Sequence, residues 1–147
     1  MLNVAVLDDY QDVTKKFGNW SQLEGKINLK IFNKYFDHSN ELVKNLSDFD
    51  VLCLMRERTS LSSSIINQLP KLKLVITTGM WNPSIDKEAL NKRKIVFCGT
   101  ENRIESTAEL SWLLTQIVWR NISQEFVNMK NGDWQTSIGR TLYGKTL

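Results

Sequence analysis

The chain has 147 residues, of which 41% are hydrophobic and 24% are charged, and its formal net charge at pH 7 is +3. This composition is typical of an ordinary soluble globular protein with enough apolar side chains to bury one core. The lysines are scattered, without a basic stripe interleaved with aromatic residues, so we expect no nucleic-acid partner. No apolar run approaches the roughly 20 residues that cross a bilayer, and the acidic pair Asp8-Asp9 does not fit a signal peptide. We therefore expect a cytoplasmic protein without a membrane partner.

Five short apolar runs recur along the first hundred residues, and each has the length and β-branched content of a buried strand. They are Leu2 to Leu7, Ile27 to Phe32, Asp50 to Met55, Leu72 to Thr77, and Ile95 to Cys98. Helical patterns separate them, at residues 12–17, 39–46, 62–69 and 86–92. Strands that alternate with helices predict an α/β fold, with a parallel sheet covered by helices on both faces.

A long helical pattern follows, over residues 106–130. Ser106-Thr107-Ala108-Glu109 has the form of a capping box, which predicts that the helix begins at Ser106. Two stripes of side chains follow at helical spacing: Leu110, Leu113, Leu114, Ile117 and Val118 in one, and Trp112, Trp119 and Phe126 in the other. Two stripes indicate a helix that is covered on two sides, by another domain or by another chain. A fully buried core helix would show the same periodicity, so both interpretations stay open. Gly132 is expected to end the helix.

The cysteine and histidine content predicts no metal site. Cys53 and Cys98 lie in apolar runs, which predicts buried and reduced thiols rather than a disulfide. His38 is the only histidine, and it stands at an expected helix start on the solvent side. We therefore interpret His38 as a surface residue rather than a general base.

The loops after the strands are the places to look for a binding site, because ligands of parallel sheets bind beyond the carboxyl ends of the strands. These loops are residues 8–11, 56–60, 78–84 and 99–105. Arg56-Glu57-Arg58 could clamp an anion, since arginine presents a bidentate fork to a carboxylate, but a surface ion-pair cluster is an equal alternative. Gly79 permits a tight turn with successive exposed amides, which form an anion-binding nest; an ordinary loop glycine is the competing interpretation.

Five motifs occur in order along the chain: VAVLDDYQD, MRERT, LVITTGMWNPSID, TAELSWLLTQIVWR, and GDWQ followed by L-x-GKTL. With these motifs the chain resembles the D-isomer-specific 2-hydroxyacid dehydrogenase family, which includes phosphoglycerate and glycerate dehydrogenases. The resemblance covers essentially the whole chain. It implies a flavodoxin-like substrate domain in residues 1–99, then a hinge, a long crossover helix and the start of an NAD-binding domain in residues 100–147.

The resemblance also implies an activity and a set of site residues. The activity is the oxidation of a D-2-hydroxy acid, or the reduction of a 2-oxo acid, with NAD or NADP. By resemblance, Arg56 and Glu57 line the substrate side of the cleft. Backbone amides of Gly79, Met80 and Trp81 would bind the substrate carboxylate, and Thr107 would touch the cofactor. The helix over residues 106–130 would form a homodimer interface.

The chain departs from the family pattern in one large respect. It contains no Gly-x-Gly-x-x-Gly fingerprint, and the family's catalytic Arg, carboxylate and His belong to a part that would follow residue 147. No catalytic residue is therefore assigned, the dinucleotide-binding domain is expected to be truncated, and the fragment is expected to be inactive alone.

Two non-enzymatic alternatives follow from the same pattern. The first is a flavodoxin-like binding or dimerisation module. The second is a receiver domain, which shares an acidic pair after its first strand. The receiver is disfavoured because Met55-Arg56 stands where the phosphate-accepting Asp would be.

Overall fold

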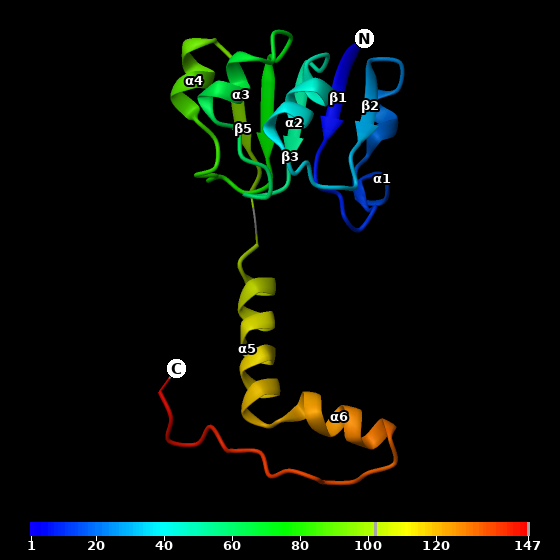
Figure 1. Cartoon of the computed structure of the whole chain (residues 1–147), viewed down its shortest axis with the longest axis vertical. Coiled ribbons are helices and arrows are strands. Elements are labelled where there is room, and N and C mark those ends of the chain that lie inside the picture. Colours follow the sequence, from blue (N-terminus) through cyan, green and yellow to red (C-terminus); the bar gives the residue numbers. More distant parts are fainter. Residues whose placement is uncertain (102, 147) are drawn as a thin grey trace. The chain divides into compact units, whose positions relative to one another are not determined.

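The chain forms two compact units, Met1–Asn102 and Arg103–Leu147, in this computed structural model. The structure describes residues 1–101 and 103–146. The first unit is a five-stranded parallel sheet with short helices, and the second carries two helices (Figure 1). Among the described residues, no helix has the length and apolar character needed to cross a bilayer.

The five predicted strands are all present, within two residues of the expected bounds. They are β1 (Leu2–Val6), β2 (Ile27–Ile31), β3 (Val51–Leu54), β4 (Leu74–Thr77) and β5 (Val96–Gly99), all parallel, in the order β2-β1-β3-β4-β5. This is the flavodoxin-like order: β2 lies on one side of β1, and β3, β4 and β5 follow on the other side. The predicted α/β class and the flavodoxin-like sheet are confirmed.

The helices of the first unit are short. They are α1 (Thr14–Phe17), a 3₁₀ turn η1 (Trp20–Leu23), α2 (Ser39–Leu46), α3 (Ser63–Asn67) and α4 (Lys87–Lys92). The start of α4 is fixed by Asp86, whose Oδ1 accepts a hydrogen bond from the backbone N–H of Ala89 at 2.9 Å. Capping of this kind satisfies an amide that the helix itself leaves without an acceptor.

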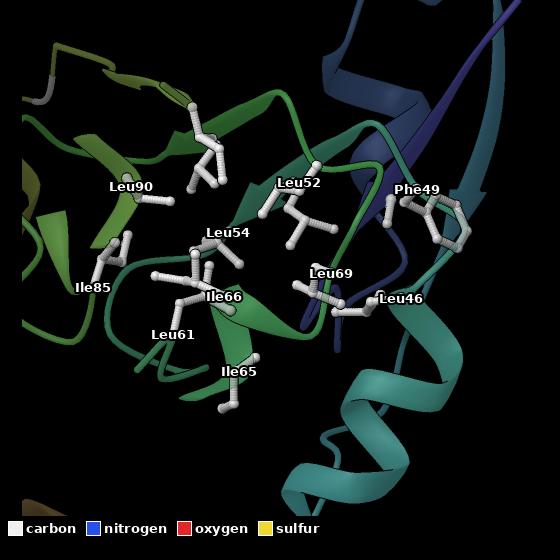
Figure 2. Packing of buried hydrophobic residues seen from close by; sticks show 14 of the residues in the cluster. Leu46, Phe49, Leu52, Leu54, Leu61, Ile65, Ile66, Leu69, Ile85 and Leu90 are labelled. Carbon is white, nitrogen blue, oxygen red and sulfur yellow. The ribbon is translucent and has the colours of Figure 1, made fainter. Parts of the chain in front are cut away.

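One face of the sheet packs on helices α2, α3 and α4. The ladder register places Ala5, Leu52, Val75 and Phe97 in one row across four strands. These side chains form a core with Leu46 of α2, with Ile65 and Ile66 of α3, and with Leu90 of α4; Figure 2 shows many of the buried members. Burial of such apolar side chains is the main source of stability of the unit.

The opposite face is covered mainly at β1 and β2. The connection from β1 to β2 runs against the direction of the other three, so a right-handed crossover places α1 and η1 on this face. Trp20 and Leu23 of η1 accordingly line one hollow with Ile27 and Leu29 of β2. Helices on both faces are thus confirmed, but the helices of the first unit leave this face open at β5, where the Cys98 side chain is exposed. The prediction of a buried thiol at Cys98 is therefore wrong.

The second unit contains two helices, α5 (Glu105–Trp119) and α6 (Ile122–Lys130), where the sequence predicted one helix over residues 106–130. The break is at Asn121, whose φ of 54° is left-handed. Asparagine adopts this backbone conformation more readily than most residues. The helical spacing of the apolar residues is the same on both sides of Asn121, so the sequence pattern does not reveal the break.

The predicted capping box at Ser106 is also wrong. The carbonyl of Ile104 already accepts the backbone N–H groups of Thr107 and Ala108, and Ser106 lies within the first helical turn. A residue inside the turn has helical φ and ψ, so its hydroxyl cannot take the position of a cap. Gly132 has a φ of 92° and follows α6 closely, as the sequence predicted.

The segment after α6 packs against its own unit. Trp119 Nε1 donates a hydrogen bond to the carbonyl of Thr141 at 3.0 Å, and the backbone N–H of Arg140 donates to the carbonyl of Trp119 at 3.0 Å. A Cβ at Gly139 would stand 2.7 Å from the Cα of Arg120, so glycine is needed for this close approach.

Candidate functional site

The loops predicted from the sequence meet at the carboxyl edge of the sheet. The backbone N–H of Arg56, after β3, donates to Thr78 Oγ1, after β4, at 3.0 Å. The backbone N–H of Gly79 donates to Thr100 Oγ1, after β5, at 3.0 Å. Arg58 Nη1 donates to the carbonyl of Asp8, after β1, at 2.8 Å. Four loops from distant parts of the sequence are therefore joined into one surface.

Arg56 and Gly79 lie in direct contact. The φ of Gly79 is +90°, and a Cβ built there would stand 2.6 Å from Nη1 of Arg56. Glycine permits the left-handed backbone here, and it also lets the guanidinium lie where a Cβ would otherwise stand. Arg56 itself has a φ of 51°, which is rare for a residue with a Cβ and marks a conformation that its surroundings must hold.

Of the three backbone amides that the sequence suggested in the turn after β4, those of Gly79, Met80 and Trp81, two lack an acceptor within the described chain. The amide of Gly79 is bonded to Thr100, as described above. Among the described residues, the backbone N–H groups of Met80 and Trp81 have no hydrogen-bond acceptor. The side chains of these two residues are 66% and 68% exposed. An anion at this turn would therefore meet two successive amides beside one guanidinium.

Asn82 is a member of the site that sequence reasoning missed. Its side chain is fully buried, and its Nδ2 donates to the carbonyl of Arg56 at 2.7 Å and to Thr77 Oγ1 at 3.0 Å. Its Oδ1 accepts the backbone N–H of Ser84 at 3.0 Å. The Asn-Pro pair marks a turn in the sequence, but nothing local reveals that this Asn points inward.

Glu57 and Arg58 behave differently from Arg56. Glu57 is exposed, and no salt bridge within the described part of the chain involves it. Besides its bond to Asp8, Arg58 places its guanidinium carbon 4.6 Å from the ring centroid of Tyr10. The alternative of a surface ion-pair cluster at Arg56-Glu57-Arg58 thus finds no support in the described contacts.

The acidic pair after β1 has structural partners. Asp8 is 1% exposed, and its Oδ2 accepts the hydroxyl of Thr59 at 2.6 Å. Partial desolvation and the nearby Asp8 carboxylate raise the pKa of Tyr10, whose hydroxyl donates to Asp8 Oδ1 at 3.1 Å. The Asp9 carboxylate accepts the backbone N–H groups of Val13 and Thr14 at the start of α1. Within residues 1–101 and 103–146, no group of three or more acidic, Cys or His side chains could hold a metal ion.

Trp81 is anchored from α4. Lys87 Nζ lies 4.3 Å from the ring centroid of Trp81 and 4.9 Å from that of Phe97. A cation over two aromatic faces stabilises this arrangement by electrostatic attraction. The contact with Lys87 therefore restrains the indole at the side of the amide turn.

Thr107, the predicted cofactor contact, belongs to the second unit. It is exposed in the first turn of α5, and its carbonyl accepts the hydroxyl of Ser111 at 2.8 Å. A hollow of about 630 Å³ also occurs in the second unit, along α6 and residues 134–139. None of the predicted substrate-binding residues lines this hollow.

The sequence model of the D-isomer specific 2-hydroxyacid dehydrogenase catalytic domain matches residues 4–136. The chain belongs to this family. This confirms the resemblance carried by the five motifs.

Individual dehydrogenases show the same relationship. The D-3-phosphoglycerate dehydrogenase of Methanocaldococcus jannaschii is 34% identical over 110 residues, which are 73% of this chain and 21% of that protein. The structure of phosphoglycerate oxidoreductase from Vibrio cholerae O395 is 30% identical, with a TM-score of 0.89, and the match covers 99% of this chain and 47% of that one. A D-lactate dehydrogenase from Aquifex aeolicus, solved with NAD and lactic acid, shares the fold at 18% identity and a TM-score of 0.66, over 95% of this chain and 41% of that one.

The chain is shorter than these dehydrogenases. It spans about a fifth of the curated relative and just under half of the solved relative. The match therefore concerns the N-terminal portion of those proteins.

Proposed function

We propose that this chain supplies the substrate-carboxylate site of a D-2-hydroxyacid dehydrogenase. The observation that carries the proposal is the contact between the Arg56 guanidinium and the Gly79 turn, next to the two open amides of Met80 and Trp81. This group stands at the carboxyl edge of a parallel sheet, where ligands of such folds bind.

The proposed chemistry of the site is recognition of a carboxylate. The two amides would donate to the carboxylate oxygens, and Arg56 would supply the positive charge that makes these hydrogen bonds strong. Glu57 and the Trp81 indole would border the rest of the substrate. A small 2-hydroxy or 2-oxo acid matches this arrangement, because its reacting carbon is bonded directly to the carboxylate.

The redox step needs groups that this chain does not supply. NAD or NADP would accept or donate the hydride when bound. The sequence has no Gly-x-Gly-x-x-Gly strand-turn-helix to hold the pyrophosphate, so the groups that bind the nucleotide and carry out the chemistry would come from outside these 147 residues. In this proposal residues 1–99 act as the substrate domain, residues 100–147 lead into a nucleotide domain, and Thr107 is the cofactor contact. The fragment alone would be inactive, and its location would be cytoplasmic.

A homodimer is the second part of the proposal. Leu110, Leu113, Leu114 and Val118 of α5 are 50–74% exposed, and Trp112 is 48% exposed. Apolar side chains gathered on one helix favour association with another chain. The same exposure supports the alternative function, a dimerisation module without catalysis. Sedimentation of the chain, compared with a variant carrying Leu113→Gln and Leu114→Gln, tests this part separately.

The substrate site can be tested on the chain itself. Oxamate is a stable 2-oxo monocarboxylate analogue, and its titration into the isotope-labelled chain should shift the amide resonances of Met80 and Trp81. The shifts should be lost in Arg56→Gln and kept in Arg140→Gln, which removes an exposed arginine of the second unit. Equal binding by the wild type and Arg56→Gln would refute the proposed role of Arg56.

A further inference from the structure

We propose that Asn82 is a positioning residue that holds Arg56 so that its guanidinium faces the Gly79 turn. The inference rests on the proposed function for the statement that Arg56 binds a carboxylate. The positioning itself is a property of the chain without ligand, and it can be tested separately.

The backbone of Arg56 is held at both of its polar groups by side chains of the next loop. Its N–H donates to Thr78 Oγ1 at 3.0 Å, and its carbonyl accepts from Asn82 Nδ2 at 2.7 Å. The φ of 51° at Arg56 needs such support, because a residue with a Cβ is strained there. No other part of the β3 loop is held through both its N–H and its carbonyl by side chains in the described structure.

Asn82 can make these bonds in one orientation only. Its Nδ2 also donates to Thr77 Oγ1 at 3.0 Å, and its Oδ1 accepts the N–H of Ser84 at 3.0 Å. A flipped amide would bring oxygen against the Arg56 carbonyl and NH₂ against the Ser84 N–H. The side chain is fully buried, so water cannot replace a lost partner without rearrangement. The Asn82 amide therefore connects the two loops through hydrogen bonds of fixed orientation.

Asn82 joins the two parts of the proposed carboxylate site, the amide turn and Arg56. Asn82 directly follows Trp81, so the residue that ends the amide turn also holds the arginine that lies against it. A displacement of Arg56 relative to Gly79 would separate the positive charge from the open amides. Loss of the Asn82 amide should therefore lower the affinity of the turn for an anion.

The first arm of the test uses no ligand. A nuclear Overhauser contact between the Arg56 side chain and the Gly79 α-protons should be present in the wild type. It should vanish in Asn82→Ser, which removes the amide, and in Asn82→Asp, which keeps an acceptor for Ser84 but loses the donor to Arg56. The contact should persist in Asn91→Ser, which changes an exposed asparagine of α4. A contact that persists in both Asn82 variants overturns the inference, and Asn82→Asp decides the matter if Asn82→Ser does not fold.

The second arm is a double-mutant cycle with oxamate. When Arg56 is present, Asn82→Ser should weaken oxamate binding roughly tenfold. It should cause no further loss in the Arg56→Gln background, because a residue that acts through Arg56 has nothing left to position. The same fold-loss in both backgrounds would mean a general structural role and would overturn the inference. Absence of oxamate binding by the wild-type chain would refute the proposed function, and the first arm would then decide the positioning alone.

Discussion

The guanidinium of Arg56 lies against the α-carbon of Gly79, with Nη1 2.6 Å from the point where a Cβ would stand. The Gly79→Ala substitution should therefore displace the guanidinium and weaken oxamate binding by at least about tenfold, as expected for loss of a charged hydrogen bond. It should also destabilise the chain by about 1–2 kcal/mol, because alanine is strained at a left-handed φ. Calorimetric titration and urea unfolding measure the two effects.

Gly25 offers a matched control for this substitution. Its φ is +73°, and a Cβ there would have no atom within 4 Å. Gly25→Ala should show a similar loss of stability without any change in oxamate affinity. Equal oxamate affinity in Gly79→Ala and the wild type would contradict the proposed contact.

Thr59 and Asp8 form a buried hydrogen bond of 2.6 Å that joins the β1 and β3 loops. Thr59→Val keeps the shape of the side chain but removes the donor from a carboxylate that is 1% exposed. We expect a loss of about 1–3 kcal/mol in the free energy of unfolding, the usual effect of leaving a buried polar group without its partner. Ser21→Ala, an exposed site, should change stability by no more than about 0.5 kcal/mol. An unchanged urea midpoint for Thr59→Val would show that this bond is absent in solution.

The stability of the chain should depend on pH through Asp50. The hydrogen bond from Lys73 Nζ at 2.8 Å, and a second from the backbone N–H of Asn3, lower the pKa of Asp50 from the usual 3.8. Because the folded chain binds this proton more weakly than the unfolded chain, the stabilisation is complete well above pH 3.8. It is lost as the pH falls through 3.8 towards the lower folded pKa. Urea unfolding at a series of pH values should show a flatter acid profile for Asp50→Asn and for Lys73→Gln. Profiles parallel to the wild type would refute the assignment.

The two thiols should differ in reactivity. Burial raises the pKa of Cys53 to about 11, so little thiolate forms there, whereas Cys98 is exposed on the open face of the sheet. With a disulfide reagent near pH 8, we expect one fast thiol per folded chain and a second only after unfolding. Cys98→Ser should abolish the fast reaction, and Cys53→Ser should leave it unchanged. Two fast thiols in the wild type would contradict the partial burial of Cys53.

The sheet was predictable from the sequence because each strand is a short apolar run, which is typical of parallel strands packed on at least one face. The loops that carry Arg56 and Gly79 were predictable too, since the carboxyl ends of parallel strands share one edge. The break at Asn121 was not, because the stripes from Leu110 to Phe126 keep helical spacing on both sides of it. A single left-handed residue changes the direction of the chain without changing that pattern.

The details of the site depend on tertiary contacts that leave no local mark. Asn82 looks like a turn residue in the sequence, and its role appears only when its amide meets the Arg56 carbonyl. Thr100 is similar: its hydroxyl accepts the backbone N–H of Gly79, so the amide of Gly79 is not free to bind an anion as the sequence suggested. The position of Cys98 was mispredicted for a related reason, because an apolar strand at the end of a sheet can have one face uncovered.

If this chain provides the substrate domain of a D-2-hydroxyacid dehydrogenase, it should support turnover when it is joined to a nucleotide domain. The most direct test is to join residues 1–147 to the remaining portion of the Vibrio cholerae relative and to follow NADH oxidation with a panel of small 2-oxo acids. We predict turnover that is lost in Arg56→Gln and retained in Arg140→Gln. A folded chimera that binds NADH but reduces none of these acids would contradict the claim.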